Sequence, residues 1–337
     1  MSLNEEKCKR LYQKYHDTIA VSIALYDLFR SNPSLGKFIG ESHRLFTFDD
    51  EVLTPDISTS YEANSKGLVF EIKYSIGASV KDVLLSAKRY RNAVKGWPNG
   101  AVEHVDVVLV CSAEDTQIVS SAIQELIEET ADPFFASKGF AVWQWMVSST
   151  REGMRPEAMW LQPVMGATRN SSVEQRIHSA GGMQISEDVL THLRFRHMFV
   201  RDKPPVQFTI IFLMHHILPK TEQESYEISL DTIYQRANSF FPSWWESDEK
   251  TVQVKRQWIK EALEMLLEMK LVEVGSKEET YRVPSALLRK HNALNFICKK
   301  LTRIGRRRRR VRGGVARTRR IPSRMAEGMP RLERFLK

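Results

Sequence analysis

Residues 53–73, LTPDISTSYEANSKGLVFEIK, predict two β-strands joined by a turn. β-Branched and apolar residues interleave with polar ones at both ends of this stretch, as they do in strands. The hexapeptide at 62–67 is rich in turn formers, so we expect a β-hairpin. Since side chains two residues apart share a face of a strand, Glu71 and Lys73 should point to one side and Ile72 to the other.

The hairpin would bring three charged side chains together. Asp56 lies near the start of the first strand, within reach of Glu71 and Lys73 once the hairpin folds back. Two carboxylates are hard oxygen ligands of the kind that Mg²⁺ and Mn²⁺ prefer. Phosphodiester hydrolysis needs a metal-activated water and positive charge beside the developing oxyanion, which Lys73 could supply. The alternative is a surface hairpin with an ordinary Glu/Lys pair and a turn Asp.

Pro55-Asp56, followed after fourteen residues by Glu71-Ile72-Lys73, resembles the signature of the PD-(D/E)xK nuclease superfamily. This superfamily includes restriction endonucleases and Holliday-junction resolvases. The resemblance implies that Asp56 and Glu71 bind the divalent metal, Mg²⁺ or Mn²⁺. It also implies that Lys73 orients or activates the attacking water.

The same resemblance points to residues on the flanking helices. An acidic residue on the helix before the hairpin often supplies a further metal ligand, and Glu41 is the candidate. The helix after the motif often carries a basic residue that faces the scissile phosphate, and Lys88 is the candidate. The alternative for both residues is a solvated position on a helix surface.

The periodicity of the first half of the chain predicts an α/β fold with a mixed central sheet flanked by helices. The expected helices are 4–30, 34–45, 79–94 and 115–130, and the expected strands besides the hairpin are 45–48, 105–111, 140–147 and an edge strand at 159–164. Residues 105–111 are almost continuously apolar, which is typical of a strand buried on both faces. A restriction-endonuclease-like core has this architecture, so pattern and resemblance agree.

The second half of the chain predicts a small helical domain. Apolar residues at helical spacing predict helices at 206–218, 230–241 and 251–270, followed by a two-stranded hairpin at 271–283. Three helices and a hairpin resemble a winged helix-turn-helix domain, which places its third helix in the DNA major groove and its wing on the backbone.

The winged-helix resemblance nominates five nucleic-acid-binding residues. They are Lys255, Arg256 and Lys260 on the third helix, and Lys277 and Arg282 on the wing. Winged helices also dock proteins, and several acidic residues leave that alternative open. These acidic residues are Glu261, Glu264, Glu268, Glu278 and Glu279.

The net charge of +9 comes from the end of the chain. Residues 299–320 carry twelve Lys or Arg and no acid, whereas residues 1–298 carry 34 bases and 39 acids. The run Arg306, Arg307, Arg308, Arg309 and Arg310 predicts an open tail that binds phosphates without sequence preference. A localisation signal, RNA binding, or folding of the tail onto the acidic body are the alternatives.

Three cysteines lie far apart and form no metal-ligand or disulfide pattern. The chain also lacks an apolar run of membrane-spanning length and a signal-peptide pattern at its start. We therefore expect a soluble, cytoplasmic protein in a reducing compartment, with no membrane partner.

The expected organisation is a nuclease-like domain at 1–165, a linker with a short helix at 166–204, a winged-helix-like domain at 205–290 and an Arg-rich tail at 291–337. The expected function is a metal-dependent DNA endonuclease in a restriction, transposition or repair system. Protein partners would select the target, and a homodimer would cut both strands. The alternative is a non-catalytic DNA-binding or protein-docking component of a larger complex, and the choice between DNA and RNA stays open.

Overall fold

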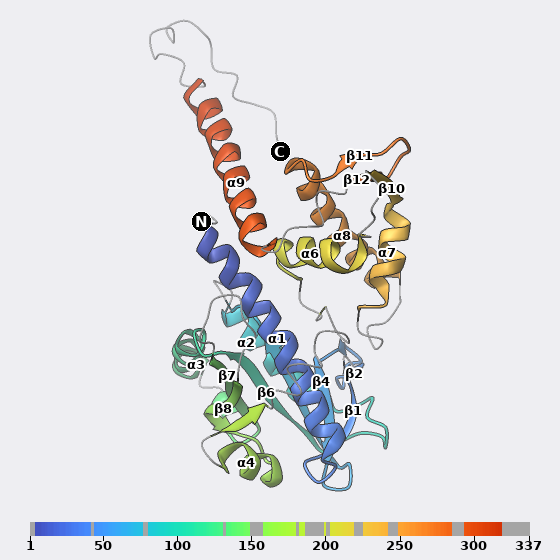
Figure 1. The fold of residues 1–337 in the computed structure, drawn as a ribbon. Coiled ribbons are helices and arrows are strands. Elements are labelled where there is room, and N and C mark those ends of the chain that lie inside the picture. Colours follow the sequence, from blue (N-terminus) through green and yellow to red (C-terminus); the bar gives the residue numbers. More distant parts are fainter. Residues whose placement is uncertain are drawn as a thin grey trace, which may run out of the picture.

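The computed structural model describes most of the chain (Figure 1). The described residues are 4–41, 44–76, 80–130, 133–148, 158–179, 182–185, 199, 203–218, 225–241, 249–284 and 293–318. The α/β class with a mixed sheet flanked by helices, predicted from the pattern, is confirmed.

A seven-stranded sheet in the order β1-β4-β5-β6-β7-β8-β9 forms the centre of the fold. Its strands are β1 (Lys37–Glu41), β4 (Ile57–Tyr61), β5 (Lys66–Lys73), β6 (His104–Ser112), β7 (Phe140–Ser148), β8 (Ala158–Ala167) and β9 (Met183–Ile185). The pairs β5–β6 and β6–β7 are parallel, and the other neighbours are antiparallel. Parallel neighbours need a helical crossover, which α2 (Val80–Arg89) and α3 (Thr116–Thr130) supply.

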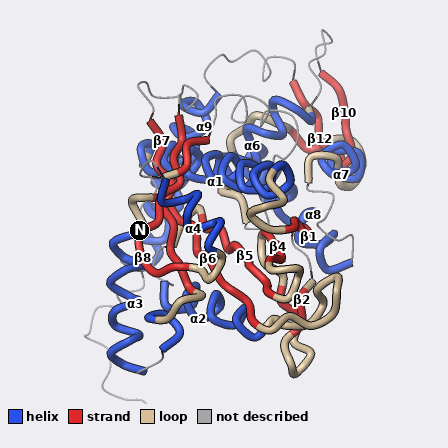
Figure 2. Tube along the Cα trace, turned by 90° about the horizontal axis from the view of Figure 1, so that it is seen from below, coloured by secondary structure: helices blue, strands red, loops and turns tan. Residues whose placement is uncertain are grey.

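The two faces of the sheet pack against different helices (Figure 2). Alternate residues of β5 divide between them: Phe70 and Ile72 join the core beneath α1 (Glu5–Ser31), and Val69 joins the core beneath α2 and α3. Val107 and Leu109 of β6 also face α2 and α3. A strand covered on both faces explains the apolar run of β6, as predicted.

The prediction of a helix at 34–45 is wrong, because residues 37–41 form strand β1 instead. β1 pairs with β4 in an antiparallel ladder, with Glu41 opposite Ile57. Pairing with a distant strand overrides the local helical pattern here. The strand expected at 45–48 is short: β2 (Leu45–Phe46) pairs with β3 (Val52–Leu53) in a separate two-stranded sheet.

The strand expected at the edge, β8, is internal, because β9 pairs with its outer side. The linker expected from residue 166 begins with ordered elements, α4 (Ser171–His178) and β9. Three residues of β9 are too few to show a periodicity, so the sequence offered little sign of it. The short helix expected near 186–199 lies outside the described residues, apart from the buried Phe199.

The second half contains the three expected helices and the expected hairpin. α6 (Val206–Phe212) continues into a π-helical turn, η4 (Leu213–Ile217), and is followed by β10 (Ser225–Ser229), α7 (Leu230–Asn238), α8 (Glu249–Glu268), β11 (Glu273–Val274) and β12 (Thr280–Pro284). β10 is an addition to the prediction and completes a small sheet in the order β10-β12-β11.

The last element, α9 (Ala293–Thr318), corrects the expectation of an open tail. The backbone of Arg306–Arg310 belongs to this helix, which extends away from the sheet in Figure 1. Buried residues at helical spacing anchor its first turns: Ala293, Ile297, Cys298, Leu301 and Ile304. Arginine is itself a good helix former, so an anchored helix can continue through the run.

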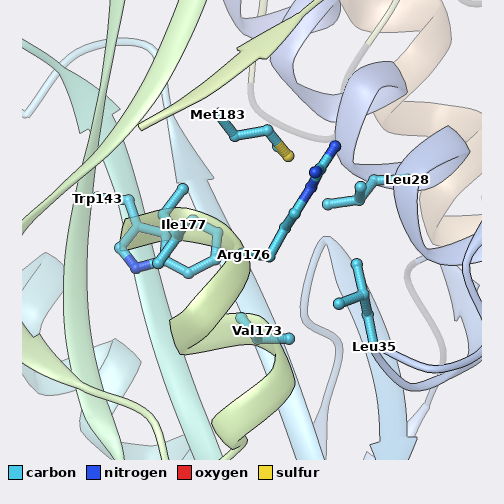
Figure 3. Close-up of a pocket in the computed structure, with 7 residues that line it drawn as sticks. All are labelled: Leu28, Leu35, Trp143, Val173, Arg176, Ile177 and Met183. Carbon is cyan, nitrogen blue, oxygen red and sulfur yellow. The ribbon is translucent and has the colours of Figure 1, made fainter. Parts of the chain in front are cut away.

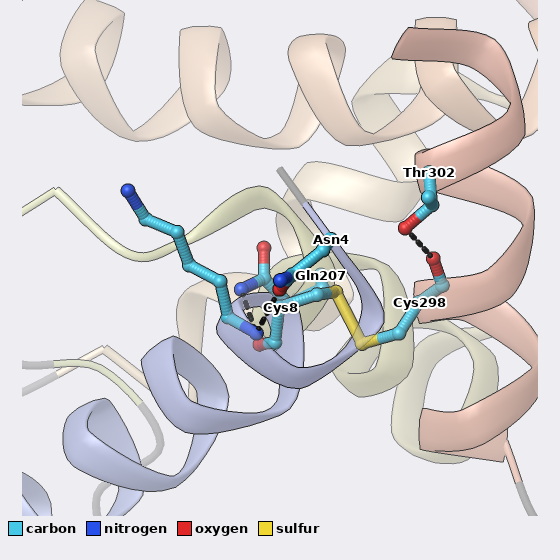
Figure 4. The surroundings of a disulfide bond; sticks show 6 residues. Asn4, Cys8, Gln207, Cys298 and Thr302 are labelled. Carbon is cyan, nitrogen blue, oxygen red and sulfur yellow. Dashed lines mark hydrogen bonds between the residues drawn. A yellow bond between two sulfur atoms is a disulfide. The ribbon is translucent and has the colours of Figure 1, made fainter. Parts of the chain in front are cut away.

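α1 and α9 are joined by a disulfide between Cys8 and Cys298 (Figure 4). Their Cα atoms lie 5.6 Å apart, and both residues are fully buried. Gln207 donates to the Cys8 carbonyl beside the bond, at 2.9 Å. The prediction of no disulfide is wrong, because cysteines 290 residues apart leave no spacing pattern to recognise. Cys111 is free, and burial raises its pKa to about 12.

A small apolar cavity of about 10 Å³ lies where α1, α4 and β7 meet (Figure 3). Its lining consists of Leu28, Leu35, Trp143, Val173, Arg176, Ile177 and Met183. The space is about that of one water molecule and is lined mainly by carbon, so it is a packing defect and not a ligand site. None of the described helices has the length and hydropathy that crossing a membrane requires.

Asp17 is a buried carboxyl on α1, 7% exposed, that accepts a hydrogen bond from Gln13. Burial raises its pKa from 3.8 to about 7, and the charge of Glu114 acts in the same direction. The folded protein therefore keeps a proton that the unfolded chain loses. A raised carboxyl pKa favours the folded state only while the group is protonated. The free energy of unfolding should therefore fall as the pH rises from the unfolded pKa of 3.8 to the folded pKa of about 7.

We expect Asp17→Asn to remove about 2–3 kcal/mol of pH dependence between about pH 5 and pH 8. The measurement is urea unfolding of wild type and variant at intervals across this range. Asp49→Asn, at an exposed aspartate, is the matched control and should leave the slope unchanged. Parallel curves for wild type and Asp17→Asn would contradict the assignment.

Candidate active site

The β4–β5 hairpin predicted from residues 53–73 is confirmed, with strands slightly shorter than expected. Glu62, Ala63 and Asn64 adopt positive φ in the turn, which reverses the chain tightly. The ladder pairs Ile57 with Phe70 and Tyr61 with Lys66. The ladder ends at the Ile57–Phe70 pair, and Asp56 directly precedes it, so Asp56 lies beside the end of β5 that carries Glu71.

Glu71 and Lys73 face the same side of β5 and form an ion pair, as predicted. Lys73 Nζ lies 2.7 Å from Glu71 Oε1, and their side chains are 18% and 10% exposed. Ile72 points to the opposite face and joins the core beneath α1. The ion pair therefore lies on the α2 side of the sheet, at the end of β5, with limited access to solvent.

Asp56 is fixed to the same strand by two hydrogen bonds. Its Oδ2 accepts from the backbone N–H of Ile72 at 2.6 Å, and its own N–H donates to Phe70 O at 3.1 Å. Asp56 is half-buried. Asp56 is thus bonded to the strand segment that carries Glu71 and Lys73, at the open end of the hairpin.

Tyr90 is a fourth member of this site, and the sequence analysis did not nominate it. It begins η1 (Tyr90–Asn92), directly after α2. Its hydroxyl lies 3.0 Å from Glu71 Oε2 and 3.1 Å from Thr54 O. A buried tyrosine hydroxyl needs a polar partner. A tyrosine on the helix that follows β5 was therefore the sequence feature that could have predicted a contact with Glu71.

The donor set fits a hard divalent cation by chemistry. Asp56 and Glu71 supply carboxylate oxygens, and an ionised carboxylate has about four lone-pair sites, so the contacts above leave acceptor capacity. Within the described part of the chain, no group of three or more His, Cys, Asp or Glu gathers as a metal site. Two carboxylates would leave the rest of the coordination shell to water and phosphate oxygens.

Glu41, the expected third ligand, lies on strand β1 and not on a helix. Its backbone pairs with Ile57, the residue after Asp56. The chain therefore brings it near the site by sheet pairing, a route different from the one expected. The side chain of Glu41 lies outside the described part of the structure.

Two basic residues of α2 besides Lys88 pair with acidic residues. Lys81 pairs with Glu125 and Glu129 on α3, and Arg89 pairs with Glu51. These contacts favour the solvated-face interpretation for both bases. Lys88 is half-buried on the same helix, and its phosphate-binding role stays a prediction.

The prediction that Lys255 contacts DNA is wrong. It is 2% exposed on α8, and its ammonium lies over the ring of Phe241, 5.0 Å from the centroid. A cation held against an aromatic face in the core is not available to a phosphate. Trp258 and Ile259 follow at helical spacing, so Lys255 lies on the apolar face of its helix.

The other cations nominated in the second half lie at the surface, mostly beside carboxylates. Arg256 pairs with Asp231 at 2.7 Å, Lys260 lies 3.5 Å from Glu279, and Arg282 pairs with Glu227 at 2.9 Å. Lys277 is exposed. Arg306–Arg310 lie on α9, and their side chains are outside the described part.

Comparison of the chain with known proteins finds no match among protein-family models, curated proteins or solved structures.

Proposed function

We propose that the protein is a divalent-metal-dependent endonuclease that hydrolyses DNA. The observation that supports this proposal is that Asp56 is bonded to the strand segment that carries the Glu71–Lys73 ion pair, at the open end of the hairpin. Asp56 is fixed by Ile72, and Glu71 is fixed by Lys73 and Tyr90. Two oxygen donors beside one cation match the requirements of phosphodiester hydrolysis.

The order of the elements supports a PD-(D/E)xK-like interpretation. A helix, an antiparallel hairpin that carries the motif, a crossover helix and a buried parallel strand occur in this order as α1, β4–β5, α2 and β6, with the short strands β1, β2 and β3 between α1 and the hairpin. This is the order that the sequence resemblance implies, reached through the backbone. The fit concerns the hairpin and its neighbours and does not extend to the second half.

In this proposal Asp56 and Glu71 would hold Mg²⁺ or Mn²⁺, which lowers the pKa of a bound water and neutralises charge on the phosphate. The Lys73 ammonium would orient the attacking water and stabilise the added negative charge. Tyr90 holds one oxygen of Glu71, and the Ile72 N–H holds one oxygen of Asp56, so neither carboxylate needs to reorganise.

The second half would hold the DNA. The order α6, β10, α7, α8 and the β11–β12 hairpin supports a winged-helix interpretation, with α8 as the third helix. The arginine run on α9 would add contacts to phosphates, with affinity that falls steeply as salt rises. Partner proteins that choose the target and a homodimer that cuts both strands remain part of this proposal.

The test is cleavage of supercoiled plasmid with Mg²⁺ or Mn²⁺, for wild type and Asp56→Asn. We expect metal-dependent nicking by wild type that chelation abolishes and that the variant loses. Asp50→Asn is the matched control, because Asp50 is exposed on a nearby turn and pairs with Lys95. Equal cutting by wild type and Asp56→Asn would refute the site.

A second candidate function is protein docking by α8 and the β11–β12 hairpin. It is favoured by the ion pairs that occupy Arg256, Lys260 and Arg282, and by Val254 and Val274, which are 38% and 72% exposed. If the plasmid stays intact and DNA binding depends only on α9, docking becomes the better account of this region.

A further inference from the structure

A second polar site lies at the opposite end of the sheet from Glu71. A pocket of about 320 Å³ opens beside the first residue of β6, His104, which pairs with the first residue of β5, Lys66. Glu71 lies five residues further along β5, roughly 17 Å at 3.3 Å per residue. The pocket and the candidate active site are therefore separate.

The back of the pocket is organised by Asp106, whose side chain is fully buried. Its Oδ2 accepts hydrogen bonds from Tyr61 Oη at 2.9 Å and from the Arg169 N–H at 2.6 Å. Its Oδ1 lies 3.2 Å from Arg169 Nη1, so the guanidinium is held by a neutralising partner behind it. The pocket wall includes Gly139, whose φ is +112° and where a Cβ would lie 2.8 Å from Arg169 Nη2.

Three basic side chains line the same pocket: Arg91, Lys138 and Arg169. The guanidinium of Arg91 stacks on Phe134, 5.9 Å from the ring centroid. Among the described residues, no carboxylate forms an ion pair with Arg91 or Lys138, in contrast to the paired bases of α2. Glu103 is the acidic residue in the lining, so cations outnumber anions there.

An exposed aromatic ring stands at the same pocket. Phe48 is 69% exposed, second only to Val274 among the large apolar side chains that the structure describes. The turn that presents it is braced: the Glu51 N–H donates to Thr47 Oγ1, and Lys95 Nζ donates to Phe48 O at 3.0 Å. Exposing an aromatic ring to water beside Arg91 and Lys138 is unfavourable unless the ring contacts a ligand.

We propose that this pocket binds one nucleotide, with the base stacked on Phe48 and the phosphate held by Arg91, Lys138 and Arg169. Its volume lies at the lower end of the roughly 300–1,000 Å³ range of small-molecule sites, which suits a single nucleoside phosphate. The nucleotide is either free in solution or one unit of an unpaired strand. The proposal stands independently of the nuclease activity.

The test is the fluorescence anisotropy of a fluorescent AMP analogue mixed with the full chain and displaced by unlabelled competitors. We expect AMP to displace the probe, and adenosine and inorganic phosphate to do so much more weakly, because each lacks one half of the contact. Phe48→Ala should weaken AMP binding about 5-fold or more, the loss of one stacking contact. Lys138→Glu should weaken AMP about 10-fold and leave adenosine unchanged.

The matched controls are Ile118→Ala, at an exposed apolar residue on α3, and Lys250→Glu, at an exposed base on α8. Neither lines the pocket, so both should bind AMP as wild type does. A single-stranded oligodeoxyadenylate of about eight nucleotides separates the two sources. Displacement by the strand far below the AMP concentration identifies a strand nucleotide, and stronger displacement by AMP identifies a free one.

No displacement by AMP at millimolar concentration would overturn the proposal. Equal affinity in wild type, Phe48→Ala and Lys138→Glu would do the same. Both substitutions are at exposed side chains, and circular dichroism melting of each variant verifies that it is folded before binding is scored.

Discussion

Lys73→Met is expected to reduce metal-dependent DNA cleavage by about 100-fold or more, the scale of losing one electrostatic contact to a transition state. Methionine keeps most of the length of the side chain and removes the ammonium that lies 2.7 Å from Glu71 Oε1. Because the phosphate contacts proposed for the arginine run lie elsewhere on the chain, DNA binding should change little. The loss should therefore appear in kcat and not in KM.

The measurement is the initial rate of plasmid nicking at several DNA concentrations, with Mg²⁺ and with Mn²⁺. Lys66→Met is the matched control: Lys66 lies on the same strand, at its other end, and pairs with Glu62. Lys73→Arg keeps the charge but not its position, and should recover only part of the rate. If Lys73→Met and Lys66→Met cut DNA at the same rate as wild type, Lys73 has no role in catalysis.

Breaking the Cys8–Cys298 bond is expected to lower the free energy of unfolding by about 4–5 kcal/mol. The two cysteines are 290 residues apart, so the bond closes a loop that spans most of the chain. In the chain-entropy model a longer loop restricts the unfolded state more strongly, and the folded state gains by comparison.

The experiment compares denaturant unfolding of the oxidised protein with that of the reduced protein and of Cys298→Ala. Reduction and substitution should shift the midpoint similarly, and reduction should have no further effect on Cys298→Ala. Cys111→Ala is the control for loss of a buried thiol that forms no bond. A midpoint in wild type that does not respond to reduction would contradict a stabilising disulfide.

The candidate site could be predicted because its information is local. The turn at 62–67 and the strand periodicity on both sides lie within twenty-one consecutive residues, and the alternation of a strand placed Glu71 and Lys73 on one face. Tyr90 was missed because its partner on β5 is nineteen residues away. A tyrosine on an apolar helix face does not reveal which polar group it contacts.

The errors came from pairing between distant segments. Residues 37–41 form a strand because β4 is there to pair with, and three-residue β9 exists only against β8. The disulfide joins residues from opposite ends of the chain. Lys255 differs: its position on the apolar face of α8 could have been read from the spacing of Trp258 and Ile259.

The core beneath α1 also has a consequence for how the chain folds. It contains residues from Cys8 at one end of the chain to Ile304 near the other, together with strands and helices in between. Contacts of such high sequence separation give a high contact order, which slows folding. During synthesis the part of α1 that packs against α6 and α9 must wait for these helices, so its apolar surface stays uncovered until α9 has been made. That exposed apolar surface is where a chaperone would be needed.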